Sequence, residues 1–194
     1  MPSTKKMSKT YRVNEIFYSL QGEGYHTGYP AVFVRFSGCN LRCPFCDTDF
    51  STYSEMTAEE ISSAVQHLSA DSHVLIILTG GEPSLQADEH LLSTLHSTGK
   101  RICMETNGTH PIASGIDWIT CSPKERSRVV IPFADELKIV YQHQDVEQWA
   151  EHISSTHLYL QPCSCQNTAD VIDYILRHPH WHLSLQTHKY IDIR

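Results

Sequence analysis

The folds open to this 194-residue chain are limited above all by an alternation of short apolar runs, rich in Val, Ile and Phe, with stretches of helical periodicity. Polar clusters that contain Gly or Pro recur where the apolar runs end. In parallel α/β sheets and barrels, ligands bind at the carboxyl ends of the strands. About six strand-helix units can be counted, fewer than the eight of a closed barrel. The sequence therefore predicts one domain over residues 1–194, folded as an open, partial, TIM-like (β/α)6 barrel of the α/β class.

The predicted elements follow one another in a regular order. Strands are predicted at residues 31–36, 73–78, 101–105, 117–121, 136–141, 156–160 and 181–186. One helix is predicted to follow Thr57, because Thr57 and Glu60 have the spacing of a capping box. Further helices are predicted at residues 87–97, 146–153 and 168–177. The stretch 122–134 carries no clear pattern.

The charge balance and the short apolar runs argue against two classes of partner. Asp and Glu outnumber Lys and Arg by 22 to 15, a formal net charge of -7, which disfavours a nucleic-acid partner. No apolar run approaches the roughly 18 to 20 residues of a transmembrane helix, so no membrane partner is expected. Residues 1–10 are expected to form an unstructured polar leader without the apolar region of a signal peptide. We therefore expect a cytoplasmic protein.

Three of the seven cysteines form the strongest motif in the chain. An odd number of cysteines without a secretion signal favours metal or redox use over disulfides. Cys39, Cys43 and Cys46 are spaced so that their thiolates can converge on one metal centre. A structural zinc site would need a fourth ligand, for which Cys163 and Cys165 are poorly spaced. On a 4Fe-4S cluster, three thiolates would leave one iron open to a substrate or cofactor, which implies chemistry.

A second element, Thr-Gly-Gly-Glu-Pro at residues 79–83, follows the next predicted strand. The two elements, in this order and at successive strand ends, resemble the radical S-adenosylmethionine superfamily, whose fold is a partial β/α barrel. Within it, the chain resembles the 7-carboxy-7-deazaguanine synthase family over nearly its whole length. The distinguishing motifs are Ser-Leu-Gln-Gly-Glu-Gly at 19–24 and Cys-Asp-Thr at 46–48. Some relatives carry a long insertion between the first two cysteines, so their loop geometry is not transferred to this short form.

The resemblance implies a lyase of the queuosine precursor (7-deazapurine) pathway. Such enzymes convert 6-carboxy-5,6,7,8-tetrahydropterin to 7-carboxy-7-deazaguanine with loss of ammonia. A reduced 4Fe-4S cluster on Cys39, Cys43 and Cys46 would cleave S-adenosylmethionine to a 5'-deoxyadenosyl radical, which would take a hydrogen atom from the pterin. The resemblance also implies a Mg2+ ion, an electron donor such as flavodoxin or ferredoxin, and a homodimer.

For S-adenosylmethionine, the resemblance implies contacts from segments that follow the strands. These residues are Phe45, Cys46, Asp47, Gly80, Gly81, Glu82, Glu105, Ser122, Pro123, Lys124, Gln161, Pro162, Cys163 and Ser164. Three of these segments have a plainer alternative: an aromatic that fills the core at Phe45, and ordinary turns at residues 80–82 and 122–124. In the last segment only Gln161 and Pro162 match the family, so Cys163 and Ser164 are weaker.

For the other ligands, the resemblance implies Thr48 as the Mg2+ ligand and the following pterin contacts: Leu20, Gln21, Gly22, Glu23, Arg35, Thr79 and Arg194. Amide and carboxylate groups suit an aminopyrimidinone edge, and the planar fork of Arg35 suits a carboxylate. The alternative for Arg35 is an internal ion pair with Glu15 or Asp47. The alternative for Thr48 is a turn or helix cap. The tail, residues 187–194, is expected to fold back and close the pocket.

Two other functions compete with this interpretation. A glycyl-radical-enzyme activase shares the cysteine loop but acts on a protein backbone, and it lacks the set of Gln21, Gly22, Glu23 and Arg35. A non-enzymatic zinc or iron-sulfur module would bind metal without cleaving S-adenosylmethionine. The motifs favour the radical enzyme with a small pterin substrate.

Overall fold

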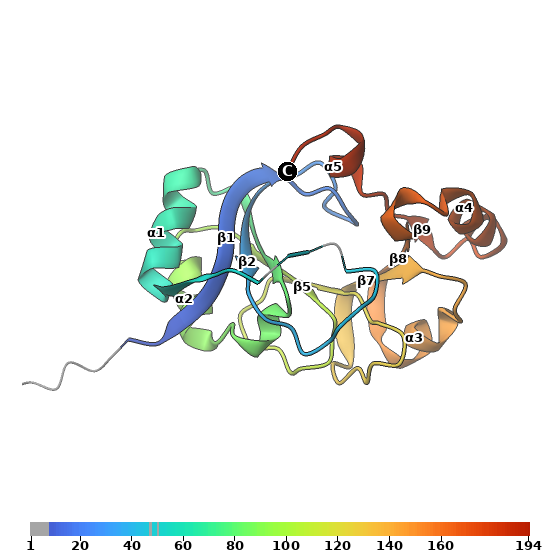
Figure 1. The fold of residues 1–194 in the computed structure, drawn as a ribbon, viewed down its shortest axis with the longest axis horizontal. Helices are drawn as coiled ribbons and strands as arrows, with labels where there is room; N and C mark the ends of the chain where they lie inside the picture. The colour runs from blue at the N-terminus through green and yellow to red at the C-terminus, as the bar shows by residue number, and fades with distance from the viewer. Residues whose placement is uncertain (1–7, 47, 50) are drawn as a thin grey trace, which may run out of the picture.

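One mixed sheet organises the computed structural model, which describes residues 8–46, 48–49 and 51–194 (Figure 1). Across these residues the sheet has nine strands in the order β3-β1-β2-β4-β5-β6-β7-β8-β9. β2 and β4 to β9 run parallel, whereas β1 pairs antiparallel with β2 and β3. β3 and β9 lie at opposite edges and do not close the sheet, which confirms the predicted open partial barrel. The strands are β1 (Thr10–Leu20), β2 (Pro30–Phe36), β3 (Ser54–Thr57), β4 (Leu75–Gly80), β5 (Ile102–Thr106), β6 (Trp118–Cys121), β7 (Phe133–Tyr141), β8 (Ser154–Pro162) and β9 (His182–Leu183).

Helices cover the outer face of the sheet in two groups. α1 and α2 lie together beside β1 and β2, and α3 and α4 lie beside β8 (Figure 1). α1 begins with the predicted capping box, in which the Thr57 side chain accepts from the Glu60 amide and the Glu60 carboxylate accepts from the Thr57 amide at 2.8 Å. The helices are α1 (Ala58–Leu68), α2 (Glu89–His96), α3 (Glu147–His152), α4 (Thr168–Arg177) and α5 (Thr187–Tyr190), with 3-10 turns η1 (Pro83–Leu85) and η2 (Cys163–Cys165).

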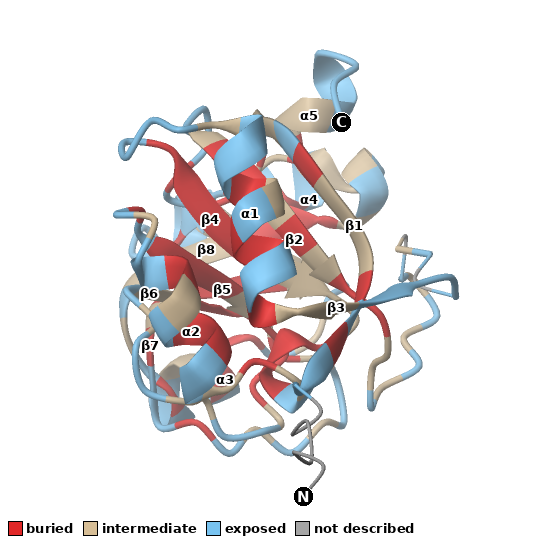
Figure 2. Ribbon diagram, turned by 90° about the vertical axis from the view of Figure 1, so that its left-hand side faces the viewer, coloured by how far each residue is buried: buried red, intermediate tan, exposed pale blue. Residues whose placement is uncertain are grey.

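Alternation along the strands separates an apolar outer face from a more polar inner one. On β2, Val32 and Val34 are fully buried in the core under α1 and α2, while Arg35 lines the inside of the barrel. On β7, Leu137 and Ile139 are buried in a second core under α3 and α4, while Lys138 points inward. Figure 2 shows the buried strands β2 and β4 behind the exposed outer side of α1. The side chains that face inward are therefore available to a ligand site.

The predicted parallel strands and four helices are present with shifted ends, and three features differ from the prediction. β1 and β3 were not predicted, because β1 has an irregular register between Val13 and Glu15 that obscures its alternation. The last strand is two residues long instead of spanning residues 181–186. The short helix α5 was not predicted. Within the described residues no helix joins β5 to β6 or β6 to β7, in agreement with the predicted helices, and Ile112 and Ile131 from these connections pack on the apolar cores.

The expected leader is shorter than ten residues. Thr10 begins β1, and Lys9 already pairs with Asp88 at 2.6 Å. The cause is Tyr11, whose ring is fully buried and whose hydroxyl donates to Asp88 at 2.7 Å. Residues 1–7 lie outside the described residues. No helix in the described part of the chain is both long and apolar enough to cross a membrane.

Candidate active site

A cavity of about 710 Å³ occupies the inside of the barrel and is lined by residues from β1, β2, β4, β5, β7 and β8. It is bounded by the cysteine loop, the ends of β4 to β8 and the C-terminal tail. The predicted site residues that line it are Leu20, Gln21, Glu23, Arg35, Cys39, Cys43, Phe45, Cys46, Thr48, Thr79, Gly80, Gly81, Glu105, Ser122, Lys124, Gln161, Pro162, Cys163, Ser164 and Arg194. One chamber therefore holds groups proposed for the cluster, for S-adenosylmethionine and for the pterin.

The cysteine loop is fixed at its start by the Gly-Gly element at the end of β4. The Gly81 amide donates to the Phe36 carbonyl at 3.0 Å, and the Glu82 amide donates to the Gly38 carbonyl at 2.9 Å. A Cβ on Gly81 would lie 2.0 Å from the Gly38 carbonyl oxygen, and one on Gly80 would lie 2.2 Å from the Phe36 carbonyl oxygen. The glycines are therefore required for close approach to the chain's own cysteine loop, in addition to any approach to a cofactor.

The three loop thiols share the cavity but differ in exposure, with Cys39 and Cys43 half-buried and Cys46 exposed. Burial raises the pKa of both Cys39 and Cys43, and in the case of Cys43 the nearby Lys124 opposes the shift. The Leu41 amide donates to Cys39 Sγ at 3.4 Å, the kind of bond that tunes an iron-sulfur cluster.

The thiols are not gathered around a single point. Within residues 8–46, 48–49 and 51–194, no three His, Cys, Asp or Glu side chains are arranged to hold one metal ion. The thiolates of a 4Fe-4S cluster bind different irons, so they need not meet at one ion. Three thiols from one short loop, facing one cavity and with an amide directed at a sulfur, fit such a cluster by the chemistry of the donor set.

The Glu82 carboxylate is turned away from the cavity and is fully buried. It accepts from the Ser84 amide at 3.1 Å, the Ser84 hydroxyl at 2.6 Å, the Thr106 hydroxyl at 2.7 Å and the Asn107 amide at 2.7 Å. Asn107 in turn lies with its side-chain nitrogen 3.9 Å from Cys39 Sγ. Glu82 therefore joins the end of β4 to the end of β5 beside the cysteine loop, and its expected contact with the cofactor amino group would need another conformation.

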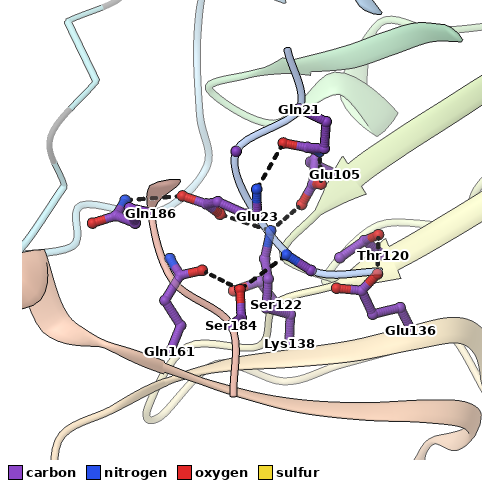
Figure 3. Close-up of polar contacts among 12 residues, drawn as sticks. Gln21, Glu23, Glu105, Thr120, Ser122, Glu136, Lys138, Gln161, Ser184 and Gln186 are labelled. Carbon is purple, nitrogen blue, oxygen red and sulfur yellow. Dashed lines mark hydrogen bonds and ion pairs between the residues drawn. The ribbon is translucent and has the colours of Figure 1, made fainter. Parts of the chain in front are cut away.

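A buried lysine, Lys138, connects the polar residues on the opposite wall (Figure 3). Its ammonium pairs with Glu23 at 2.7 Å and with Glu105 at 2.9 Å. Gln21 donates to Glu105 at 3.0 Å, and Gln186 donates to Glu23 at 2.9 Å. Burial would raise the pKa of Glu23, but Lys138 and the amide of Gln186 outweigh it and lower that pKa to about 2. Burial opposes the charge of Lys138, but the surrounding carboxylates raise its pKa.

Arg35 forms one of its two alternative ion pairs while still lining the cavity. Its Nε pairs with Glu15 at 2.8 Å, and its Nη1 lies 3.4 Å from the Thr48 hydroxyl. Glu15 also pairs with Arg194, and both guanidinium groups lie near the Phe17 ring, at 5.8 Å for Arg35 and 4.9 Å for Arg194. Two cationic side chains therefore share one carboxylate at the end of the cavity near Thr48.

The tail folds over the loop that follows β1, as expected for residues 187–194. The Thr187 amide and hydroxyl both donate to the Gly22 carbonyl at 2.9 Å, and the Ser19 hydroxyl donates to the Arg194 carbonyl at 2.6 Å. A Cβ on Gly22 would lie 2.2 Å from His188 Nδ1. Figure 1 shows α5 between the end of β1 and the β8–β9 region, where it covers the open side of the barrel.

Lys124 lies between two of the segments predicted to bind S-adenosylmethionine, residues 122–124 and the cysteine loop. Its ammonium donates to the Ser122 hydroxyl at 2.8 Å and lies 5.8 Å from the centre of the Phe45 ring. Burial lowers the pKa of Lys124. In the last predicted segment, Ser164 has φ 47 and lies in the left-handed region, at the turn η2 that ends β8.

Some predicted residues do not line the cavity, and some that line it were not predicted. Gly22, Glu82 and Pro123 are absent from the lining among the described residues, and Asp47 lies outside them. The unpredicted lining residues include Thr106, Asn107, Lys138, Gln186 and His188. The sequence could have indicated Lys138 as a site residue, because a lysine inside the apolar run 136–141 is as unusual as Arg35 inside 31–36.

The chain is similar to known proteins over nearly its whole length. The model of the Radical SAM superfamily matches residues 33–154. A 7-carboxy-7-deazaguanine synthase of Bacteroides thetaiotaomicron is 56% identical over 183 residues, which cover 94% of this chain and 98% of that protein. Another, of Bradyrhizobium diazoefficiens, is 42% identical over an alignment of 209 positions, which covers 95% of this chain and 100% of that protein. The crystal structure of QueE from Escherichia coli matches with a TM-score of 0.76 and 28% identity, covering 92% of this chain and 95% of that one.

The chain is therefore a radical S-adenosylmethionine enzyme, a class that works with a 4Fe-4S cluster and S-adenosylmethionine. Within that class it belongs to the 7-carboxy-7-deazaguanine synthase family, lyases of the queuosine pathway. The resemblance seen in the motifs is thereby confirmed. The two competing functions, the activase and the non-enzymatic module, are not supported.

Proposed function

We propose that this chain converts 6-carboxy-5,6,7,8-tetrahydropterin to 7-carboxy-7-deazaguanine with release of ammonia, the conversion expected of its family. The observation that carries the proposal is the single cavity, in which the three loop thiols face Arg35 and the group of Gln21, Glu23 and Glu105. A ligand in this cavity contacts both the cofactor side and the polar wall. The chemistry and the recognition of the substrate can therefore occur in one cavity.

On the cofactor side, Cys39, Cys43 and Cys46 would hold the cluster, with the backbone of Gly80 and Gly81 beside it. When bound, the cluster and S-adenosylmethionine supply hydrogen-atom abstraction. Lys124 and Phe45 lie where they can bind the rest of the cofactor. The tail and the loop after β1 keep water from the open side of the barrel.

On the substrate side, Arg35 would bind the carboxylate of the pterin through the part of its guanidinium that Glu15 does not occupy. Thr48 would bind a Mg2+ ion together with substrate oxygens and water, which is the usual mode for this ion. The Arg35 guanidinium lies next to the Thr48 hydroxyl. The negative carboxylate of the substrate would therefore lie between two positive charges, the guanidinium of Arg35 and the Mg2+ ion on Thr48. We further propose a cytoplasmic homodimer supplied with electrons by a flavodoxin or ferredoxin.

An anaerobic assay tests the function. The reconstituted enzyme is incubated with dithionite, S-adenosylmethionine and 6-carboxytetrahydropterin, and 5'-deoxyadenosine and 7-carboxy-7-deazaguanine are measured together. Both products are expected, and both should be lost in Cys43→Ala, along with most of the roughly four irons per chain. The matched control is Cys121→Ala, a buried cysteine outside the cavity, which should keep its iron. Cleavage of S-adenosylmethionine without the deazaguanine would overturn the proposed substrate.

A further inference from the structure

The wall of the cavity formed by β7 contains a buried cation that neither the motifs nor the comparisons assign. Lys138 has a side chain only 3% exposed, whereas the Glu23 and Glu105 side chains with which it pairs are each 20% exposed. The ammonium is therefore the more deeply buried charge, although Lys138 lines the cavity together with both carboxylates. A ligand on this wall meets chiefly the carboxylate oxygens.

Lys138 and its neighbour Glu136 clamp the loop that follows β1 onto β7. Glu136 accepts from the Tyr25 amide at 3.1 Å, and a Cβ on Gly24 would lie 1.9 Å from its Oε1. The Ser184 hydroxyl accepts from the Gly24 amide at 2.9 Å. Figure 3 shows Glu23 and Glu105 reaching the same ammonium from opposite elements. The position of Glu23 is therefore set by β7.

The hydrogen bonds leave the two carboxylates able to accept more. Among the contacts of the described residues, Lys138 donates to both Oε2 atoms, Gln186 to Glu23 Oε1, and Gln21 to Glu105 Oε1. An ionised carboxylate offers about four lone-pair sites. Two carboxylates side by side match a ligand edge that carries adjacent N–H donors, such as an amino group next to a ring N–H.

We propose that Lys138 is a positioning residue that holds Glu23 and Glu105 as a paired set of acceptors, at the wall where the family resemblance already implies contact with the 2-amino-4-oxopyrimidine edge of the pterin. The inference rests on the proposed function, because it names how that site recognises its pterin. It predicts that a 2-oxo analogue, which lacks the amino donor, is rejected at this wall.

The charges around Glu23 give the proposal a pH signature. The groups that face Glu23 are Lys138 and Glu136 from β7, Glu105 from β5, Lys124 from the β6–β7 connection and His188 from α5. In the native enzyme the pKa of Glu23 is about 2, so it stays ionised from pH 6 to 9. In Lys138→Met, burial is no longer opposed by the ammonium, so the pKa of Glu23 rises. Lowering the pH then protonates Glu23 and removes an acceptor.

The test measures binding and not turnover. Anaerobic calorimetry gives the Kd of 6-carboxytetrahydropterin for the cluster-loaded enzyme with S-adenosylmethionine, in wild type and Lys138→Met, from pH 6 to 9. The ratio of the two Kd values, which cancels titration of the ligand, should be at least tenfold at pH 6 and should shrink toward pH 9. Lys138→Arg should restore most of the affinity. Lys9→Met, the matched control, removes a lysine that pairs with Asp88 outside the cavity, and should bind within about threefold of wild type.

Two results would overturn the inference: a loss in Lys138→Met that is the same at every pH, which indicates packing alone, or no loss. If Lys138→Met does not fold, Glu23→Gln supplies the test, because it should lose the preference for the pterin over its 2-oxo analogue. An unchanged preference in Glu23→Gln would also overturn the inference. Failure of the wild-type enzyme to bind the carboxypterin would instead count against the proposed function.

Discussion

Replacing Glu82 by Gln separates a structural role of this residue from a direct contact with the cofactor. The amide can keep Glu82 Oε1 as an acceptor for Ser84 and Thr106, but its nitrogen would face the Asn107 amide, donor against donor. Losing that charge-assisted bond costs about 2 kcal/mol, and weakening the other three costs about 1 kcal/mol in total. The neutral amide is easier to bury, which offsets about 1 kcal/mol. The expected net loss is therefore about 2 kcal/mol of unfolding free energy.

Urea unfolding of the metal-free protein measures this loss without any cofactor. Glu82→Gln should unfold at a lower urea concentration with an unchanged m-value, because the substitution does not change the amount of surface that unfolding exposes. Glu125→Gln, an exposed carboxylate, is the matched control and should unfold like wild type. If Glu82→Gln were as stable as wild type but bound S-adenosylmethionine tenfold more weakly, the carboxylate would act on the cofactor and the reasoning would be refuted.

Three further substitutions follow from the contacts in the cavity. Gly81→Ala should destabilise the protein by about 1 to 3 kcal/mol through overpacking against the Gly38 backbone, and it should reduce iron content. Gly28→Ala has open space around it, so it should keep its iron even though the positive φ of Gly28 strains an alanine and lowers stability; loss of iron in Gly28→Ala but not in Gly81→Ala would contradict the packing argument. Arg35→Ala should weaken carboxypterin binding at least tenfold more than S-adenosylmethionine binding in calorimetry, and equal effects would reject its substrate role. Thr48→Ala should abolish stimulation of turnover by Mg2+, and undiminished stimulation would remove Thr48 from the metal site.

The parts of the fold that the sequence predicted are those with strong local patterns. The strand that ends at Phe36 is a continuous apolar run, and α1 carries a capping box at Thr57, so both could be placed without tertiary information. β3 could not, because Ser54–Thr57 is polar and becomes a strand only by pairing with β1. The absence of helices from the described connections around Ile112 and Ile131 agreed with the prediction, but the packing of these two side chains on cores built from distant segments could not be predicted from local pattern.

The same distinction applies to the site. Motif spacing placed Cys39 and Gly81 correctly on adjacent strand ends, because carboxyl ends of parallel neighbours share one edge. A motif does not determine the direction of its side chains. The Gly-Gly-Glu sequence therefore could not predict that the Glu82 carboxylate turns away from the cavity and accepts from Thr106. Lys138 was not predicted as a site residue because it belongs to no local motif. Its partners Glu23 and Glu105 are 115 and 33 residues away in the chain.

The most direct measurement of the central claim is an anaerobic crystal structure of the enzyme with its cluster, S-adenosylmethionine and 6-carboxytetrahydropterin. The account predicts a 4Fe-4S cluster held by Cys39, Cys43 and Cys46 alone, with the pterin carboxylate on Arg35 and its amino-bearing edge on Glu23 and Glu105. A fourth protein side chain on the cluster, or a pterin bound outside the cavity, would contradict it.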